Sequence, residues 1–275
     1  VAYDDRGRPA AMGHSAVSDG VPSIARAWEY NEDQMVDVSE VWSAESGVVS
    51  RHELNFDDAG NLVDRATELH GRTWRECYDH DALYRLVESF TVEVDDSCEE
   101  GVSGGGDESF EHSYSYSSDG NLLSWTIDGD QRVYSYPDAG DDRPHAPVGV
   151  GSDSYRWDEA GNLVERTVDG ELEEFGWDVE GRLSSVVADG DETGFVYDVE
   201  GQRLLRQVGD QATLYVAGHE AVAVDGDIVE AVRSYSFGGE LVATRSTRGV
   251  SYMAADAAGS LEAAMDDGGE VTGSR

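Results

Sequence analysis

A seven-residue motif recurs along the chain at a spacing of about 20 residues. It consists of an aromatic residue, Asp, two variable residues, Gly, Asn or Arg, and Leu, as in WDEAGNL at 157–163 and WDVEGRL at 177–183. A period of this length indicates a repeat architecture, in which each unit is one supersecondary element and neighbouring units bury each other. The most regular aromatic positions are Tyr116, Tyr136, Trp157, Trp177 and Tyr197.

Each repeat carries two turn signals between β-prone runs. Asp-Gly pairs at 128–129, 169–170, 189–190 and 225–226 predict tight hairpins, because a type I′ turn needs positive φ at both central residues. The Asp and Gly of the motif predict a second turn, which the Asp side chain initiates and Gly closes. The predicted structural turn residues are Asp158, Gly161, Asp178, Gly181, Asp198 and Gly201.

This alternation of turns and runs predicts an all-β fold. Each repeat would supply two strands of about eight residues, and successive hairpins would form an antiparallel meander within a long curled or spiralling sheet. One face carries a column of leucines, but two residues further on the same face is polar, at Asp64, Ser124, Glu165 and Ser185. The opposite face is mixed. Because neither face is continuously apolar, we expect no dry sandwich. The leucine column is Leu62, Leu122, Leu163 and Leu183, and the mixed positions are Arg65, Trp125, Arg166 and Val186.

The net charge of the chain is extreme. The sequence has 58 acidic residues and a formal charge of −39, and all 19 basic residues are arginine. Such a density of like charge opposes compaction in dilute salt, and molar salt screens it. The composition therefore predicts a protein of an extreme halophile. A disordered acidic chain is the rival interpretation, but the regularly placed aromatic residues argue against it.

The same charge excludes several functions. No basic stripe is available for DNA, RNA or anionic lipid, and no run of 18 apolar residues predicts a membrane-spanning helix.

We expect no cofactor and no dedicated metal site, because the EF-hand spacing is not intact, although acidic turns could hold a cation opportunistically. The two cysteines, Cys77 and Cys98, are predicted either to form a disulfide or to remain as two thiols.

The repeated motif resembles the YD repeats of the RHS family, whose consensus is close to YDxxGRL. The resemblance runs from Tyr3 to at least Leu204 and is tightest from Tyr116 to Leu204. Beyond it, YSFGGELVA at 235–243 is similar to the YxxGGxLVA strand of the family's core segment. DAAGS at 256–260 matches the family's DHLGS motif only in part, since alanines replace His and Leu.

The resemblance implies three regions and a structural role. Residues 1–115 would be degenerate repeats with long loops, residues 116–213 regular repeats, and residues 214–275 a core-like segment that is incomplete at its C-terminus. The resemblance also implies a long β-sheet strip that spirals into a hollow shell, and in this family such shells enclose a C-terminal toxin that an aspartate site releases by self-cleavage. Because that site would lie beyond Arg275, no catalytic residue carries over. We expect a shell segment of a secreted or cell-surface protein, with a C-terminal effector as partner and strand edges open to self-association.

Two other function classes remain open. An adhesin or filament module could bind glycans or neighbouring cells through exposed aromatic residues. An enzyme is the least favoured class, because the histidines are scattered and no HExxH or GxSxG motif is present. The proposed sugar-stacking residues are Trp28, Trp42, Trp74 and Trp125.

Overall fold

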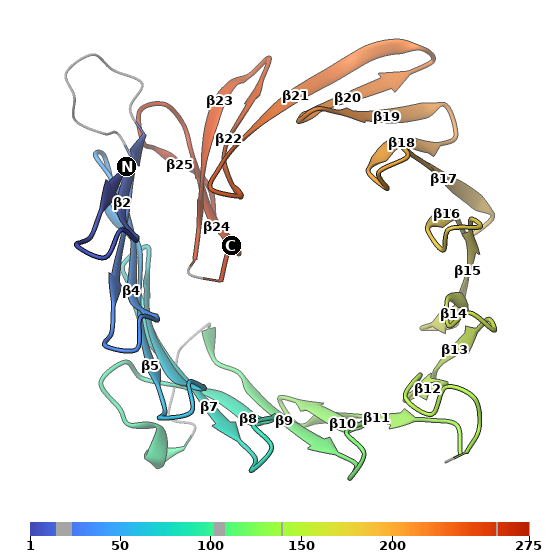
Figure 1. Ribbon diagram of the computed structural model, residues 1–275, viewed down its shortest axis with the longest axis horizontal. Coiled ribbons are helices and arrows are strands. Elements are labelled where there is room, and N and C mark those ends of the chain that lie inside the picture. The colour runs from blue at the N-terminus through green and yellow to red at the C-terminus, as the bar shows by residue number, and fades with distance from the viewer. Residues whose placement is uncertain (15–23, 102–107, 139, 257, 275) are drawn as a thin grey trace. The chain divides into compact units, whose positions relative to one another are not determined.

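The fold is an all-β meander, as the turn pattern predicts. The structure is a computed structural model that describes residues 1–14, 24–101, 108–138, 140–256 and 258–274. Within them lie 25 strands and one short 3-10 helix, η1 (Cys98–Glu100). Consecutive strands pair as antiparallel neighbours along the chain (Figure 1).

The strands of the N-terminal half are β1 (Ala2–Tyr3), β2 (Pro9–His14), β3 (Ile24–Tyr30), β4 (Val36–Ser43), β5 (Gly47–Phe56), β6 (Leu62–Leu69), β7 (Arg72–His80), β8 (Leu86–Val92), β9 (Glu111–Tyr116), β10 (Leu122–Ile127) and β11 (Asp130–Ser135). The remaining strands are β12 (Gly149–Val150), β13 (Asp153–Trp157), β14 (Leu163–Val168), β15 (Glu171–Trp177), β16 (Leu183–Ala188), β17 (Asp191–Tyr197), β18 (Arg203–Val208), β19 (Gln211–Val216), β20 (His219–Val224), β21 (Asp227–Phe237), β22 (Glu240–Ser246), β23 (Gly249–Ala255), β24 (Leu261–Met265) and β25 (Val271–Ser274).

The chain divides into two compact units, and the second comprises residues 115–125 and 130–234. This second unit is a single layer of hairpins. Among its described residues, only Thr213 is fully buried. The expectation that the mixed faces form no dry sandwich is therefore confirmed for this unit. Its strands β14 to β19 have six or seven residues rather than about eight, because turn residues occupy both ends of each repeat.

The Asp-Gly pairs form the predicted tight turns. Asp128, Asp169, Asp189 and Asp225 have φ values between 50° and 53°, and the glycines that follow them have φ values between 86° and 92°. Positive φ at both central residues is the requirement of a type I′ hairpin. The local sequence therefore sets where each of these hairpins reverses.

The aromatic residue of the motif ties neighbouring repeats together. Trp177 Nε1 donates a hydrogen bond to the carbonyl oxygen of Leu163 at 2.8 Å, and Tyr197 Oη donates one to that of Leu183 at 2.9 Å. Each acceptor is the motif leucine of the preceding repeat. A side chain with an apolar ring and a polar tip fits this half-buried position, which explains why the motif uses Tyr and Trp.

The glycine that closes the motif turn is predicted to be essential for stability. Gly181 has a φ of 74°, where a Cβ atom is unfavourable. We expect Gly181→Val to lower the free energy of unfolding by about 1 kcal/mol or more, measured by denaturant unfolding in molar salt. Gly194→Ala is the matched control, because Gly194 has neither a positive φ nor an atom near an added Cβ. Equal losses for both variants would contradict the turn argument.

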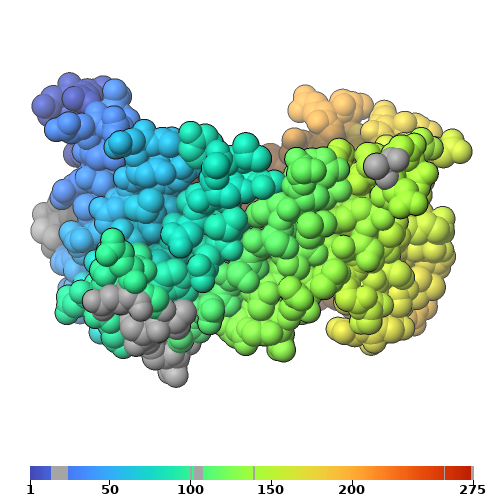
Figure 2. Space-filling view, turned by 90° about the horizontal axis from the view of Figure 1, so that it is seen from below, coloured from blue at the N-terminus to red at the C-terminus, as the bar shows by residue number. Residues whose placement is uncertain are grey.

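The first compact unit comprises residues 1–114, 126–129 and 235–275. It contains β1 to β8, here called the N-terminal sheet, and β22 to β25, here called the C-terminal layer. Figure 1 shows β24 and β25 lying beside the blue strands of the N-terminal sheet. In Figure 2 the atoms of the N-terminal sheet, coloured blue to teal, form a continuous surface.

A dry core lies between the C-terminal layer and the N-terminal sheet. Six buried side chains form it, and each has a relative exposure of 1% or less. They come from both parts: Ile24, Val41 and Val49 from the sheet, and Ala254, Ala263 and Met265 from the layer. The expectation of no dry sandwich is therefore wrong for this unit, because the mixed face is covered by a distant segment rather than by neighbouring repeats.

A disulfide links β7 of the N-terminal sheet to the short helix that follows β8. Cys77 on β7 is bonded to Cys98 in η1, with 5.6 Å between their Cα atoms. Cys77 is 1% exposed and packs with Phe90 and Val92. A cross-link over this 21-residue separation stabilises a fold by roughly 3 kcal/mol in the chain-entropy view.

Candidate functional site: a buried polar cluster beneath the C-terminal layer

The motif aspartates act as turn residues in the structure. Asp178 Oδ1 accepts hydrogen bonds from the backbone N–H groups of Glu180 and Arg182, and Oδ2 accepts one from Arg182 Nε. Asp158 has the same arrangement with Asn162. The Asn or Arg of the motif is thus explained, because it supplies a side-chain donor that reaches back to Asp.

These bonds also explain the charge state of the turns. The backbone N–H of Arg182 is the main cause that holds the pKa of the Asp178 carboxyl below its usual value, and the Arg182 side chain adds to it. For Asp158 the Asn162 side chain is the main cause of the lowered pKa. Asp198 accepts backbone bonds from Glu200 and Gln202. The glycines of the three turns, Gly161, Gly181 and Gly201, have φ values of 90°, 74° and 83°.

The DAAGS segment forms the same turn. Asp256 Oδ1 accepts hydrogen bonds from the backbone N–H groups of Ala258 and Ser260, at 2.9 and 2.8 Å. Gly259 closes the turn with a φ of 87° and donates its N–H to the Asp256 carbonyl oxygen. The segment that resembles DHLGS is therefore another member of the motif series. Residue 257, where alanine replaces the family's His, lies outside the described residues.

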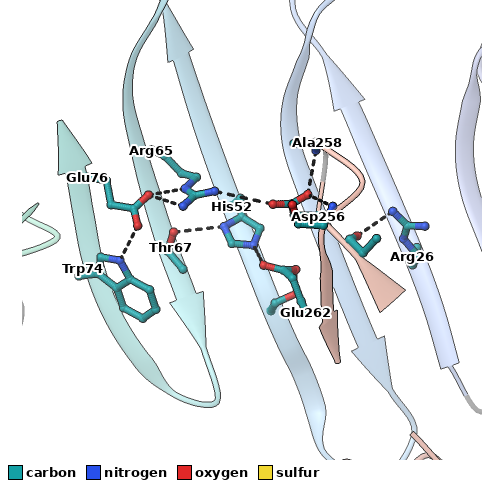
Figure 3. Close-up of polar contacts among 12 residues, drawn as sticks. Arg26, His52, Arg65, Thr67, Trp74, Glu76, Asp256, Ala258 and Glu262 are labelled. Atoms are coloured by element: carbon teal, nitrogen blue, oxygen red, sulfur yellow. Dashed lines mark hydrogen bonds and ion pairs between the residues drawn. The ribbon is translucent and has the colours of Figure 1, made fainter. Parts of the chain in front are cut away.

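Next to this turn, polar side chains gather between the N-terminal sheet and the C-terminal layer (Figure 3). We call them the buried polar cluster. Strands β5, β6 and β7 supply one side, while β24 and the turn before it supply the other. The members are Ser50, His52, Arg65, Thr67, Trp74, Glu76, Tyr78, Asp256 and Glu262.

His52 and Glu262 form the central contact of the cluster. His52 Nε2 lies 2.5 Å from Glu262 Oε1, and the two side chains are 4% and 12% exposed. His52 Nδ1 lies 3.1 Å from Thr67 Oγ1, and Ser50 Oγ donates to Glu262 Oε2 at 2.9 Å. With Glu262 ionised, Nε2 must carry a proton, while Thr67 can either donate to Nδ1 or accept from it.

The ionised form of Glu262 is favoured at this position. Burial by itself would raise the pKa of Glu262. The hydrogen bond and positive charge of His52, together with the hydrogen bond from Ser50, outweigh burial and hold the pKa below its usual value. A desolvated carboxylate stays charged only when such partners compensate the lost hydration.

A second contact extends the cluster toward β7. Arg65 Nε donates to Glu76 Oε2 at 2.5 Å, and Arg65 Nη1 lies 3.9 Å from Asp256 Oδ2. Tyr78 Oη also donates to Glu76 at 2.8 Å. Burial, followed by the charge of Glu76, raises the pKa of the Tyr78 phenol, so the phenol remains a donor at neutral pH.

Arg26 makes a further contact from β3 to the C-terminal layer. Its guanidinium donates to the Ala255 carbonyl oxygen at 2.7 Å and to Glu240 at 2.5 Å. Arg26 is 2% exposed and stacks 4.7 Å from the centre of the Trp28 ring. Hydrogen bonds from β3 and from β5 therefore both hold the layer on the sheet.

A cavity of about 410 Å³ borders the cluster. Its lining includes His52, Thr67, Trp74, Glu108, Ser260 and Glu262. Across the described ranges, no group of three or more His, Cys, Asp or Glu side chains is placed to hold a metal ion. Likewise, none of the described segments forms a helix long and apolar enough to cross a membrane.

The cluster contains the order hydroxyl, imidazole, carboxylate. Thr67, His52 and Glu262 are hydrogen-bonded in that sequence, which is also the order of a nucleophile, its base and an orienting acid. Thr67, however, is only 3% exposed and lies within β6, paired with both neighbouring strands. Such burial favours a packing role, since a nucleophile must be reached by its substrate.

The sequence did not single out this cluster. His52 belongs to the histidines described as scattered, and its partner Glu262 is 210 residues away. No spacing rule connects residues so far apart. The signal that was present is the small-residue run AADAAGSLEAAM at 254–265, which allows the C-terminal layer to approach the sheet closely.

The tryptophans proposed to stack on sugars are not exposed. Trp74 is 6% exposed and donates to Glu76, so the sequence prediction for it is wrong. Trp28, Trp42 and Trp125 are half-buried. For Trp28 the reason is that the Arg26 guanidinium lies over its ring.

Comparison with solved structures identifies the fold. A TcdB2-TccC3-TEV crystal structure matches 98% of this chain with a TM-score of 0.72 and 16% sequence identity. A Photorhabdus luminescens Tc holotoxin pore matches the same share with a TM-score of 0.65 and 14% identity. The chain thus shares the fold of these toxin structures. It spans 15% of the length of the chains it matches. No family model and no curated protein matches the sequence.

Proposed function

We propose that the chain is a structural segment of a YD-repeat β-sheet shell that carries or encloses a C-terminal effector. The observation that carries the proposal is the likeness of fold to TcdB2-TccC3 and Tc holotoxin structures, which extends over 98% of the chain. In this proposal the parent protein is secreted or displayed on the cell surface of an extreme halophile, and its effector is the principal partner.

The repeat geometry supports a structural role. The polar groups of the motif residues hydrogen-bond to one another. Asp178 accepts a bond within its own turn, and Arg182 donates to Asp178 and to the Asp198 carbonyl oxygen. Trp177 donates to the preceding repeat. Side chains engaged in this way stabilise a scaffold rather than present reactive groups.

The test is protection of whatever follows residue 275 in the natural gene product. Limited proteolysis in molar salt would compare that downstream domain in the intact protein with the same domain produced alone. We expect the attached domain to be cleaved far more slowly than the isolated one. Equal cleavage rates, or a gene that encodes no domain there, would contradict the proposal.

An adhesin or filament module is the second candidate function. The apolar side chains exposed in the second unit favour it, for example Leu172 at 51% and Leu214 at 47%. A glycan-binding screen in molar salt, with bovine serum albumin as the negative control, separates the two functions. Specific binding that survives in the intact protein would favour the adhesin.

We also propose that the chain is not an enzyme. The arrangement that most resembles catalytic machinery is Thr67, His52 and Glu262. Thr67→Val removes the hydroxyl at nearly constant volume, so a chromogenic ester assay can compare the variant with the unmodified chain. Ester turnover that disappears in Thr67→Val while the circular dichroism spectrum is unchanged would show that the chain is catalytic.

A further inference from the structure

We propose that Glu262 is an acid-sensitive latch that holds the C-terminal layer on the N-terminal sheet, and that acid releases this layer as a unit while the sheet stays folded. The inference concerns the first compact unit alone. It goes beyond the proposed shell function and does not depend on it.

Contacts within the N-terminal sheet are local in sequence, whereas contacts between this sheet and the C-terminal layer join distant residues. Strands of the N-terminal sheet pair with their immediate neighbours, as β5 does with β6 and β6 with β7. The contacts of the layer with the sheet join residues that lie far apart in the sequence, as Ser43 Oγ and the Gly269 carbonyl oxygen do, 226 positions apart and 2.7 Å from each other. The hairpins of the sheet can therefore persist when the layer detaches, which is the condition for opening as a separate cooperative unit.

Glu262 is the ionisable group at the centre of this contact. It bonds His52 on β5 and Ser50 on the same strand. Other charged or titratable side chains face the same cavity from every element around it. They are Arg65 on β6, Glu76 on β7, Glu108 ahead of β9 and Asp256 in the turn before β24.

Protonation of Glu262 removes the negative charge that compensates the neighbouring positive charges. The neutral carboxyl no longer supplies a counter-charge to His52, whose side chain is only 4% exposed, or to Arg65, whose side chain is 28% exposed. Removing one charge from a buried pair destabilises strongly, because the remaining charge has lost its hydration without compensation. Glu76 and Asp256 already form ion pairs with Arg65, so they cannot replace Glu262 as the partner of His52.

The pH window follows from the direction of the pKa shift. The pKa of Glu262 in the folded chain lies below its usual value of 4.5. The stabilisation is therefore fully present above about pH 4.5 and is lost as the pH falls through the lower folded value. Salt does not remove the latch, because buried pairs are screened much less than exposed ones.

Hydrogen exchange of the full chain in molar salt tests the latch. Peptides covering β24 would be compared with peptides covering β6, between about pH 7 and pH 3.5, after correction for the intrinsic exchange rate. In the unmodified chain we expect protection of β24 to fall by about three- to tenfold on acidification, with β6 still protected. Simultaneous loss of protection in β24 and β6 would overturn the proposal.

Two variants assign the effect to Glu262. Glu262→Gln should lose protection of β24 at least tenfold at pH 7, and this protection should no longer respond to acid. Glu53→Gln is the matched control, because Glu53 also lies on a strand of this unit but is 56% exposed and pairs with Arg51. The control should retain the acid response of the unmodified chain. An acid response that persists in Glu262→Gln would show that another group is the latch.

Discussion

Transfer from about 3 M to 0.1 M salt is expected to unfold the chain and abolish its β-sheet circular dichroism signal. Two carboxylates about 6 Å apart in water repel by roughly 0.7 kcal/mol, and the chain carries a formal charge of −39. Folded domains are stable by only about 5–15 kcal/mol, so many such repulsions exceed that margin. The Debye length is about 3 Å at 1 M and about 10 Å at 0.1 M salt, which makes screening effective only at high salt.

The structure also predicts which of the two compact units unfolds first as the salt concentration falls. The second unit has only Thr213 fully buried among its described residues, whereas the first unit has a dry core. We therefore expect β14 to β18 to lose hydrogen-exchange protection at a higher salt concentration than β4 to β7. Sodium and potassium chloride at equal ionic strength should give the same midpoint if screening is the cause. A β signal that persists at 0.1 M salt without divalent ions would contradict the prediction.

Met265→Ala is expected to have the largest effect among single core substitutions. Met265 is fully buried between the C-terminal layer and the N-terminal sheet, with Ile24, Val41 and Val49 in the same cluster. Truncating a buried Met to Ala typically costs about 2–5 kcal/mol, because apolar contact is lost and a cavity remains. We expect this loss in denaturant unfolding of the first unit, measured in molar salt, together with faster exchange in β23 and β24.

Leu261→Ala is the control on the same strand. Leu261 is 49% exposed, and surface substitutions usually change the free energy of unfolding by no more than about 0.5 kcal/mol. A comparable loss in both variants would mean that β24 is stabilised by its strand pairing rather than by docking on the N-terminal sheet.

The strand edges raise a separate expectation. Among the described residues, β1 pairs with β2 alone and β25 with β24 alone, and an exposed strand edge is a template for pairing with another chain. The sequence-based prediction of edge-to-edge association therefore remains a prediction for the chain of 275 residues. Sedimentation in molar salt measures it directly.

The local architecture could be predicted from the sequence because its causes are local. Asp189 and Gly190 adopt the positive φ values that an Asp-Gly hairpin needs, and no distant residue is required for that. Asp178 finds its partners within four positions. Repetition of such turns every 20 residues or so is sufficient to define an all-β meander.

The docking of the C-terminal layer was decided only by the tertiary structure. No periodicity relates Ile24 to Met265 or His52 to Glu262, since these contacts depend on where two distant segments of sheet come together. A mixed strand face in this sequence is compatible both with solvent, as in the second unit, and with a covering layer, as in the first. Local pattern determines turns and strand faces, whereas burial of a face depends on the sum of many weak long-range contacts that no single stretch of sequence contains.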